Sequence, residues 1–200
     1  MPRLLSNLTM NVLSLTNAVA VGALRSSGLL PEARLDFTER LESTEEYNTL
    51  LGQDGSKRQV ACRLELRARA DLRGFLDPTD LERFMGFSVE HGSSVQIPGL
   101  ARQAAVHQGW IRFSPPNGLQ YQLEFLGDHV DRSSGSRRAY YFRGAKRLRS
   151  LRQVRAWSTL SGGVYDKQTG RRELDSVLFS APAGKGPEAL LAFVKSLSLR

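Results

Sequence analysis

The sequence predicts a single, mainly β domain in which antiparallel strands form a closed or nearly closed barrel. Two stretches carry apolar residues at every second position and polar residues between them: Val60, Cys62, Leu64, Leu66 and Ala68, then Leu119, Tyr121, Leu123 and Phe125. Successive side chains of a strand leave opposite faces, so this period of two is typical of a half-buried strand. Turn-forming pairs such as Pro98–Gly99 separate the alternating runs and favour short antiparallel connections.

The first element, residues 1–34, is predicted to be a helical segment packed outside the barrel. Apolar residues recur there at spacings of three and four: Leu4, Leu8, Val12, Leu15 and Val19. This is the stripe of an amphipathic helix. A cleaved secretory signal is the alternative, since Arg3 precedes an apolar stretch and small residues follow at 18–23. Asn11 and Asn17 interrupt the stretch, which is too short and polar to span a membrane, so no transmembrane segment is expected.

Residues 35–200 form the predicted barrel domain. Its strands are expected near residues 35–41, 57–72, 85–90, 105–113, 119–125, 139–147, 154–160 and 172–179. A second helix is predicted at the end of the domain, over 187–197, where Leu190, Leu191, Val194 and Leu197 follow a helical spacing. We expect this helix to pack outside the barrel as well.

Composition sets limits on the class of protein. The chain has 200 residues, of which 40% are hydrophobic, which suffices for one domain with its own core. Its net charge of +8 suits an anionic partner or a solvated basic surface. Cys62 is the only cysteine, so the chain forms no internal disulfide and a cytoplasmic location is expected. Because Cys62 lies on the apolar phase of its strand, we predict that it packs in the core.

The common catalytic and cofactor motifs are absent. The 3 histidines lie far apart in the sequence, without metal-ligand spacing. No Gly-x-Ser-x-Gly elbow, no P-loop and no Gly-x-Gly-x-x-Gly turn occurs anywhere in the chain. The sequence therefore predicts no catalytic residue, no metal and no cofactor, and favours a module that is not an enzyme.

Short motifs follow one another along residues 37–179: Phe37-Thr38-Glu39, Leu64-x-Leu66, Asp71-Leu72-x-x-Phe75-Leu76-Asp77-Pro78, Gly86-x-x-Val89, Tyr121-x-Leu123-x-Phe125, Tyr141-x-x-Gly144-x-Lys146 and Trp157-Ser158-Thr159-Leu160. In this order they resemble the accessory β-rich module found with bacterial glucose–methanol–choline oxidoreductases, which are cholesterol-oxidase-like flavoproteins. The sequence departs from that pattern at Gln120 and lacks the histidine expected shortly after Asp77–Pro78. The resemblance implies an accessory barrel without the flavin-binding part, which binds an apolar ligand or docks on a partner oxidoreductase.

The predicted function is the binding of a lipid- or sterol-like ligand inside a calycin-like barrel, similar in form to a lipocalin, or docking on that partner enzyme. The residues expected to line the pocket are mainly apolar: Leu64, Leu66, Phe113, Tyr121, Leu123, Phe125, Tyr141, Lys146 and Trp157. Lys146 is the one charged member, and it belongs to the resembling motif. A lysine in this position would orient the polar head of a ligand or cap a strand end.

Two alternatives remain open. Residues 132–155 are rich in basic side chains: Arg132, Arg137, Arg138, Arg143, Lys146, Arg147, Arg149, Arg152 and Arg155. Together with the aromatic residues 140–142 they would suit nucleic acid or an anionic lipid surface, although a solvated outer face explains them more simply. The second alternative is a small barrel cyclase or isomerase, which needs an internal acid or base that the sequence does not identify.

Overall fold

The computed structural model describes residues 34–52, 54–77, 79–114, 118–131, 134–146, 159–180 and 197–199. These residues form strands with very little helix. The strands are β1 (Arg34–Ser43), β2 (Thr49–Leu51), β3 (Lys57–Gln59), β4 (Cys62–Asp71), β5 (Gly86–Val89), β6 (Ser94–Ile97), β7 (Ala101–Ser114), β8 (Gly118–Val130), β9 (Arg137–Lys146), β10 (Thr159–Asp166), β11 (Arg172–Ser180) and β12 (Leu197–Leu199). Two short helical segments accompany them, η1 (Glu45–Tyr47) and α2 (Leu72–Leu76).

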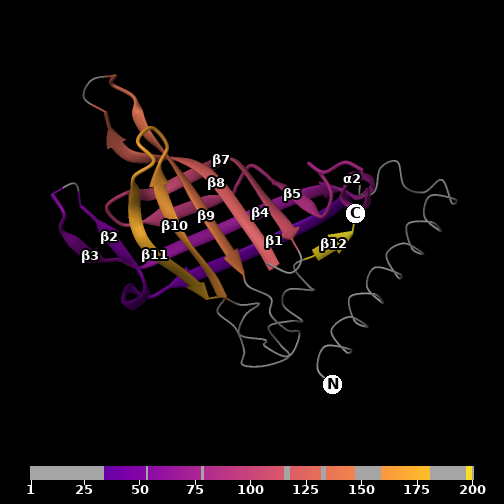
Figure 1. The fold of residues 1–200 in the computed structure, drawn as a ribbon, viewed down its shortest axis with the longest axis horizontal. Helices are drawn as coiled ribbons and strands as arrows, with labels where there is room; N and C mark the ends of the chain where they lie inside the picture. Colours follow the sequence, from indigo (N-terminus) through magenta and orange to yellow (C-terminus); the bar gives the residue numbers. More distant parts are fainter. Residues whose placement is uncertain are drawn as a thin grey trace, which may run out of the picture.

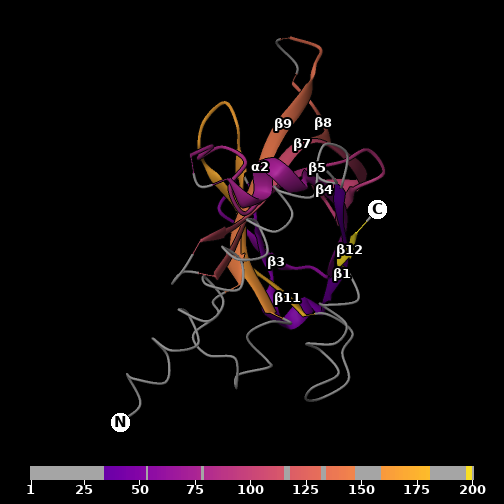
Figure 2. The same ribbon diagram turned by 90° about the vertical axis from the view of Figure 1, so that its right-hand side faces the viewer.

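All strands belong to one antiparallel sheet. Eleven of them form a continuous path in the order β12-β1-β4-β5-β7-β8-β9-β10-β11-β2-β3, and β6 pairs with both β4 and β7 beside it. A further pairing joins β1 to β11, where Glu42 lies opposite Ser180. In Figure 1 the ribbons of β1 and β4 pass behind those of β8, β9 and β10, and Figure 2 shows the same strands from the side. The sheet therefore curls over, and its two halves face each other across a shared interior.

The alternation that predicted the long strands is confirmed. Along β4 the residues from Cys62 to Ala70 are buried at every second position, and β8 repeats the pattern from Leu119 to Phe125. The inward side chains of both strands belong to one hydrophobic core. Paired long strands such as β8 and β9, in which Leu123 lies opposite Phe142, align these inward positions across the sheet.

Close packing around the buried Phe142 ring depends on glycine. The ring of Phe142 lies against the backbone of Gly144, on the same strand β9, and of Gly162, on the neighbouring strand β10. A Cβ atom added at Gly144 would come within 2.5 Å of the ring, and one at Gly162 within 2.7 Å. Only glycine leaves room for an aromatic ring at such a distance from the backbone.

The two helices predicted outside the sheet have no support. The predicted helical segment 1–34 lies outside the described residues except for Arg34, which begins β1. The second predicted helix, 187–197, also falls outside them up to residue 196, and Leu197 begins β12 instead. Leu197 and Leu199 lie opposite Phe37 and Leu35 in the register with β1, so this end of the chain has a strand period of two.

Candidate functional site

A charged cluster lies in the interior of the sheet. The Nζ atom of Lys146, at the end of β9, forms an ion pair with Oε1 of Glu39 on β1. The hydroxyl of Tyr121, on β8, donates a hydrogen bond of 2.9 Å to Oε2 of the same carboxylate. Lys146 Nζ also lies 5.9 Å from the centre of the Tyr121 ring. We call Glu39, Tyr121 and Lys146 the internal cluster.

The internal cluster is almost completely removed from solvent. The side chain of Lys146 is 1% exposed and that of Glu39 is 10% exposed. Tyr121 is fully buried, and its burial is the main cause that raises the pKa of its hydroxyl well above the ordinary value, with the charge of Glu39 adding to the effect. Tyr121 therefore remains a protonated hydrogen-bond donor throughout the neutral range.

Each member of the cluster occupies an inward position of its strand. Glu39 stands between the buried residues Phe37 and Leu41 on β1, and Lys146 continues the inward phase of Phe142 on β9. The sequence prediction included Tyr121 and Lys146 but missed Glu39. The signal was present, because Glu39 is an acidic residue on the apolar phase of its strand. Its role becomes evident only when β1 is placed across the interior from β9.

The predicted pocket residues fall into three groups. Leu64, Leu66, Leu123 and Phe125 are buried in the core beside Tyr121, and Phe113 is partly buried against it. Tyr141 is not among them: it lies on the opposite phase of β9 and stacks on Tyr165, with ring centres 5.1 Å apart. Trp157 lies outside the described residues.

The placement of Tyr141 in the interior was therefore wrong. Tyr140 and Phe142 are the residues of this aromatic run that point inward. The register explains the difference, because Phe142 lies opposite the buried Leu123 while Tyr141 lies opposite the half-buried Glu124. Three consecutive aromatic residues give no alternation in the sequence, so the phase of β9 could not be read from them.

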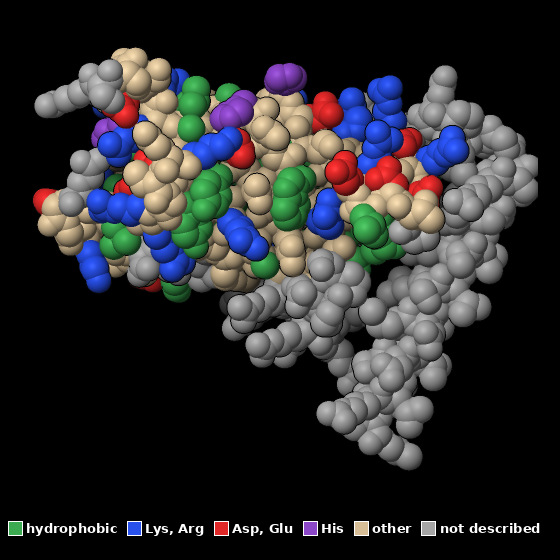
Figure 3. Space-filling view, turned by 45° about the horizontal axis from the view of Figure 1, so that its top comes forward, with side chains coloured by type: hydrophobic (Ala, Val, Ile, Leu, Met, Phe, Trp, Pro, Cys, Tyr) green, Lys and Arg blue, Asp and Glu red, His purple; other side chains and the backbone are tan. Residues whose placement is uncertain are grey.

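The described part of the basic region does not form one surface. Arg143 is exposed, whereas Lys146 lies in the interior. Arg137 donates a hydrogen bond of 2.7 Å from Nε to the carbonyl of Gly127, and Arg138 faces the carboxylate of Asp166. On the face shown in Figure 3, basic side chains are interspersed with acidic and apolar ones. This arrangement gives little support to a nucleic-acid platform within the described residues.

The described residues contain no group of three or more histidine, cysteine or carboxylate side chains placed to hold a metal ion. The Cys62 thiol is buried as predicted, and burial raises its pKa to about 12, so it remains a neutral thiol. Within the same residues, no helix combines the length and the apolar character that crossing a membrane requires.

Comparisons with protein-family models, with curated proteins and with solved structures find no match for this chain. Ligand binding or docking on a partner oxidoreductase, which the resemblance to the accessory module implies, therefore stays a prediction.

Proposed function

We propose that the protein is a β-barrel module of calycin-like form that binds a small lipid- or sterol-like ligand. In this proposal the internal cluster holds the polar group of the ligand, and the apolar side chains around it contact the body. The pairing of β1 with both β4 and β11 supports closure of the sheet into a barrel. A closed sheet of this kind has an interior in which a ligand can lie between inward-facing side chains.

The observation that carries the proposal is the buried charge of Lys146. Moving an ammonium and a carboxylate out of water costs several kcal/mol for each ion, and their attraction repays this only in part. A buried ion pair is therefore often no more stable than well-packed apolar residues of similar volume. Stability alone gives no reason to keep Lys146 and Glu39 in this core, whereas recognition of a polar group does.

The cluster lies toward one end of the sheet. Phe113 on β7 lies opposite Leu119 on β8, and Leu119 lies opposite Lys146 on β9, so these residues form a row across three strands. Phe113 is only partly buried, and the Glu39 carboxylate keeps a small exposure. A ligand that enters from this end would meet Phe113 first and reach the internal cluster with its polar group.

The chemistry of the cluster suits more than one polar group. Lys146 has three N–H donors and Glu39 accepts through two oxygens, so a ligand carboxylate or hydroxyl can bond to the ammonium and a hydroxyl can donate to Glu39. A purely hydrocarbon ligand forms no hydrogen bonds, so it would not offset the cost of keeping these charged groups away from water. We therefore expect an amphipathic ligand rather than a simple alkane.

Binding of the delipidated full-length chain to laurate, dodecanol, cholesterol and dodecane tests the proposal, with calorimetry as the measurement. We expect at least one of the first three compounds to bind more tightly than dodecane. Replacing Lys146→Met should weaken that binding by about tenfold, the loss expected for one charge-assisted hydrogen bond.

Lys167→Met is the matched control, since this lysine is half exposed and pairs with Glu124 away from the interior. Equal binding by the two variants would show that Lys146 does not anchor the ligand. Failure of the folded wild-type chain to bind any of the compounds would refute the proposal as a whole.

The same cluster favours a second candidate, a cyclase or isomerase that acts on an apolar substrate. The sequence did not identify an internal acid or base, and Glu39 and Tyr121 supply a carboxylate and a protonated hydroxyl in contact with each other. Proton transfer to carbon would introduce deuterium into the bound compound when the protein is incubated in deuterated buffer. Mass spectrometry of the extracted ligand distinguishes the two functions, because a binding module returns the compound without deuterium on carbon.

A further inference from the structure

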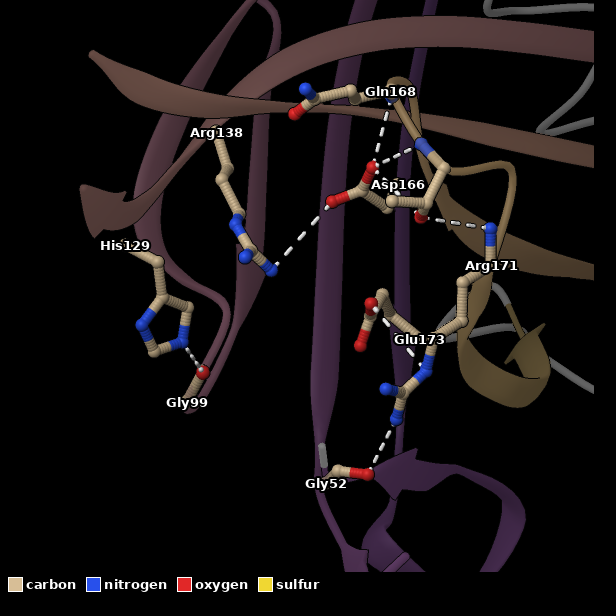
Figure 4. A network of polar contacts seen from close by, with 9 residues as sticks. Gly52, Gly99, His129, Arg138, Asp166, Gln168, Arg171 and Glu173 are labelled. Carbon is tan, nitrogen blue, oxygen red and sulfur yellow. Dashed lines mark hydrogen bonds and ion pairs between the residues drawn. The ribbon is translucent and has the colours of Figure 1, made fainter. Parts of the chain in front are cut away.

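A groove of about 410 Å³ lies at another part of the molecule, where loops and strand ends from five elements meet. Figure 4 shows His129 and Gly99 on one side, Arg171, Glu173 and Gly52 on the other, and the guanidinium of Arg138 between them. Arg58 from β3 also lines the groove. None of these residues belongs to the internal cluster. We call this space the Arg58–Arg138 groove.

Among the described residues, the Arg58 side chain is a cation without a partner. Its guanidinium lies close above Gly99, where an added Cβ would come within 1.9 Å of Nη2. Within the part of the chain that the structure describes, the guanidinium of Arg58 makes no hydrogen bond and no ion pair, while its backbone pairs with Leu50 on β2. Its donors are therefore available to a molecule in the groove, and guanidinium groups are well suited to carboxylate and phosphate oxygens.

Arg138 retains donors as well. Its Nη1 atom lies 3.8 Å from Oδ2 of Asp166, which is longer than a hydrogen bond. Asp166 has other partners, because its Oδ1 accepts from the backbone N–H groups of Gln168 and Thr169 at 2.9 and 2.8 Å. Asp166 thus orients Arg138 by its charge, while the Oδ1 atom of Asp166 accepts hydrogen bonds from the turn after β10 (Figure 4).

The groove also contains a buried acceptor. The side chain of Glu173 is 8% exposed, and its nearest cation is Arg171, with Nε 3.9 Å from Oε1. Arg171 instead donates a hydrogen bond of 2.5 Å to the carbonyl of Gly52. No described residue donates a hydrogen bond to the Glu173 carboxylate, and its oxygens are not among the sealed polar atoms that lack a partner, so they remain accessible from the groove.

The wall behind these groups is apolar. Leu50, Leu100 and Tyr140 line the groove and are buried, and the Tyr140 ring stacks on Phe125 with centres 5.9 Å apart. A volume of about 410 Å³ falls within the range of small-molecule sites, which combine an apolar lining with a few polar groups.

We propose that the Arg58–Arg138 groove binds a small molecule that carries a carboxylate or phosphate together with a hydrogen-bond donor such as a hydroxyl. The oxyanion bonds to Arg58 and Arg138, and the donor bonds to Glu173. The apolar part of the molecule lies on Leu100 and Tyr140. This site does not depend on the interior ligand proposed above, so each can fail without the other.

NMR titration of the full-length chain with para-hydroxybenzoate, benzoate and benzyl alcohol tests the proposal. The first compound has both an oxyanion and a donor, the second lacks the donor, and the third lacks the charge. We expect affinity to fall in that order, with shifts at Gly99 and Gly52. Arg58→Gln should weaken the binding of para-hydroxybenzoate by about tenfold, and Glu173→Met, which removes the acceptor, should reduce the affinity for para-hydroxybenzoate to that for benzoate.

Arg143→Gln is the matched control, since it removes the same charge from an exposed position of β9 away from the groove. An equal loss of affinity in Arg143→Gln and Arg58→Gln would mean that only the net charge of the protein attracts the anion, and would overturn the proposal. The same holds if benzyl alcohol binds as tightly as para-hydroxybenzoate, or if neither anion shifts the groove resonances at millimolar concentration. Arg58 is exposed, so its replacement leaves the core intact.

Discussion

Replacement of the two ions of the internal cluster, singly and together, gives the sharpest test of what they contribute. In Lys146→Met the Glu39 carboxylate stays in the interior with a side chain that is 10% exposed, and only the Tyr121 hydroxyl still bonds to it. In Glu39→Leu the ammonium of Lys146, at 1% exposure, loses its only counter-ion in the described structure. Removing one partner of a buried pair typically costs about 3–5 kcal/mol.

The two single variants should differ in a predictable direction. Lys146→Met should lie near the lower end of that range, about 3 kcal/mol, because Glu39 keeps a hydrogen bond and some contact with solvent. Glu39→Leu should lie nearer to about 5 kcal/mol, because the lysine is sealed. The double variant removes both charges but leaves the buried Tyr121 hydroxyl without its acceptor, so its free energy of unfolding should stay about 1–3 kcal/mol below that of the wild type and above that of Glu39→Leu.

Urea unfolding followed by fluorescence measures the four free energies, and the resulting cycle gives the coupling between the two residues. Lys167→Met serves as the surface reference, where a screened pair with Glu124 should cost at most about 1 kcal/mol. If Lys146→Met is no more destabilising than Lys167→Met, the buried ion pair does not carry the energetic weight assigned to it. The same conclusion follows if the double variant is as unstable as the less stable single variant.

Three further results are expected from individual residues. Tyr121→Phe should lower the free energy of unfolding by about 1.5–3 kcal/mol at neutral pH, because it removes a hydrogen bond to a carboxylate. The raised pKa of Tyr121 means that its hydroxyl contributes fully below pH of about 10 and progressively less above it, so urea titrations of Tyr121→Phe should show a shallower alkaline loss of stability than the wild type. Burial raises the pKa of Cys62 from the ordinary value of 9.0 to about 12, so the native chain should react with iodoacetamide about a thousandfold more slowly than the chain unfolded in urea. Similar rates in the two states would mean that the thiol is not buried. Gly127→Ala should be destabilising by about 1–3 kcal/mol because the new Cβ would lie 2.4 Å from the Tyr140 ring, whereas Gly86→Ala, with its nearest atom at 3.4 Å, should be nearly neutral in thermal unfolding.

The sequence predicted the parts of the fold that a local period determines. The runs around Leu64 and Leu123 alternate without interruption, and both became long strands with one buried face. The helix predicted over 187–197 from the spacing of Leu190, Leu191, Val194 and Leu197 lies outside the described residues except for Leu197, which belongs with Leu199 to a strand. Pairing with β1, a contact between distant parts of the chain, decides the strand conformation of these last residues.

The candidate sites could be predicted only in part, because each joins residues that are distant in the sequence. Glu39 and Lys146 are separated by 107 positions, and nothing local to either residue identifies the other. The groove is harder still, since Arg58 and Glu173 come from elements with no pattern in common. A sequence period shows that a residue faces inward, but the register between strands determines what it meets there.

The inward face of β9 connects the two sites and argues that they act independently. It carries Arg138 at its start and Lys146 at its end, with Tyr140 and Phe142 between them. Eight residue steps along a strand span about 26 Å, so the two cations lie far apart. Tyr140 and Phe142 are both almost completely buried, and the ring of Phe142 contacts Gly144, so packed side chains fill the space between the sites along this strand.

Residues that are this distant and share no partner contribute additively to stability and binding. Arg58→Gln should therefore leave the affinity for an interior ligand unchanged, and Lys146→Met should leave the affinity for para-hydroxybenzoate unchanged. A coupling energy between the two substitutions above about 0.5 kcal/mol would show that the layer of Tyr140 and Phe142 transmits structural change.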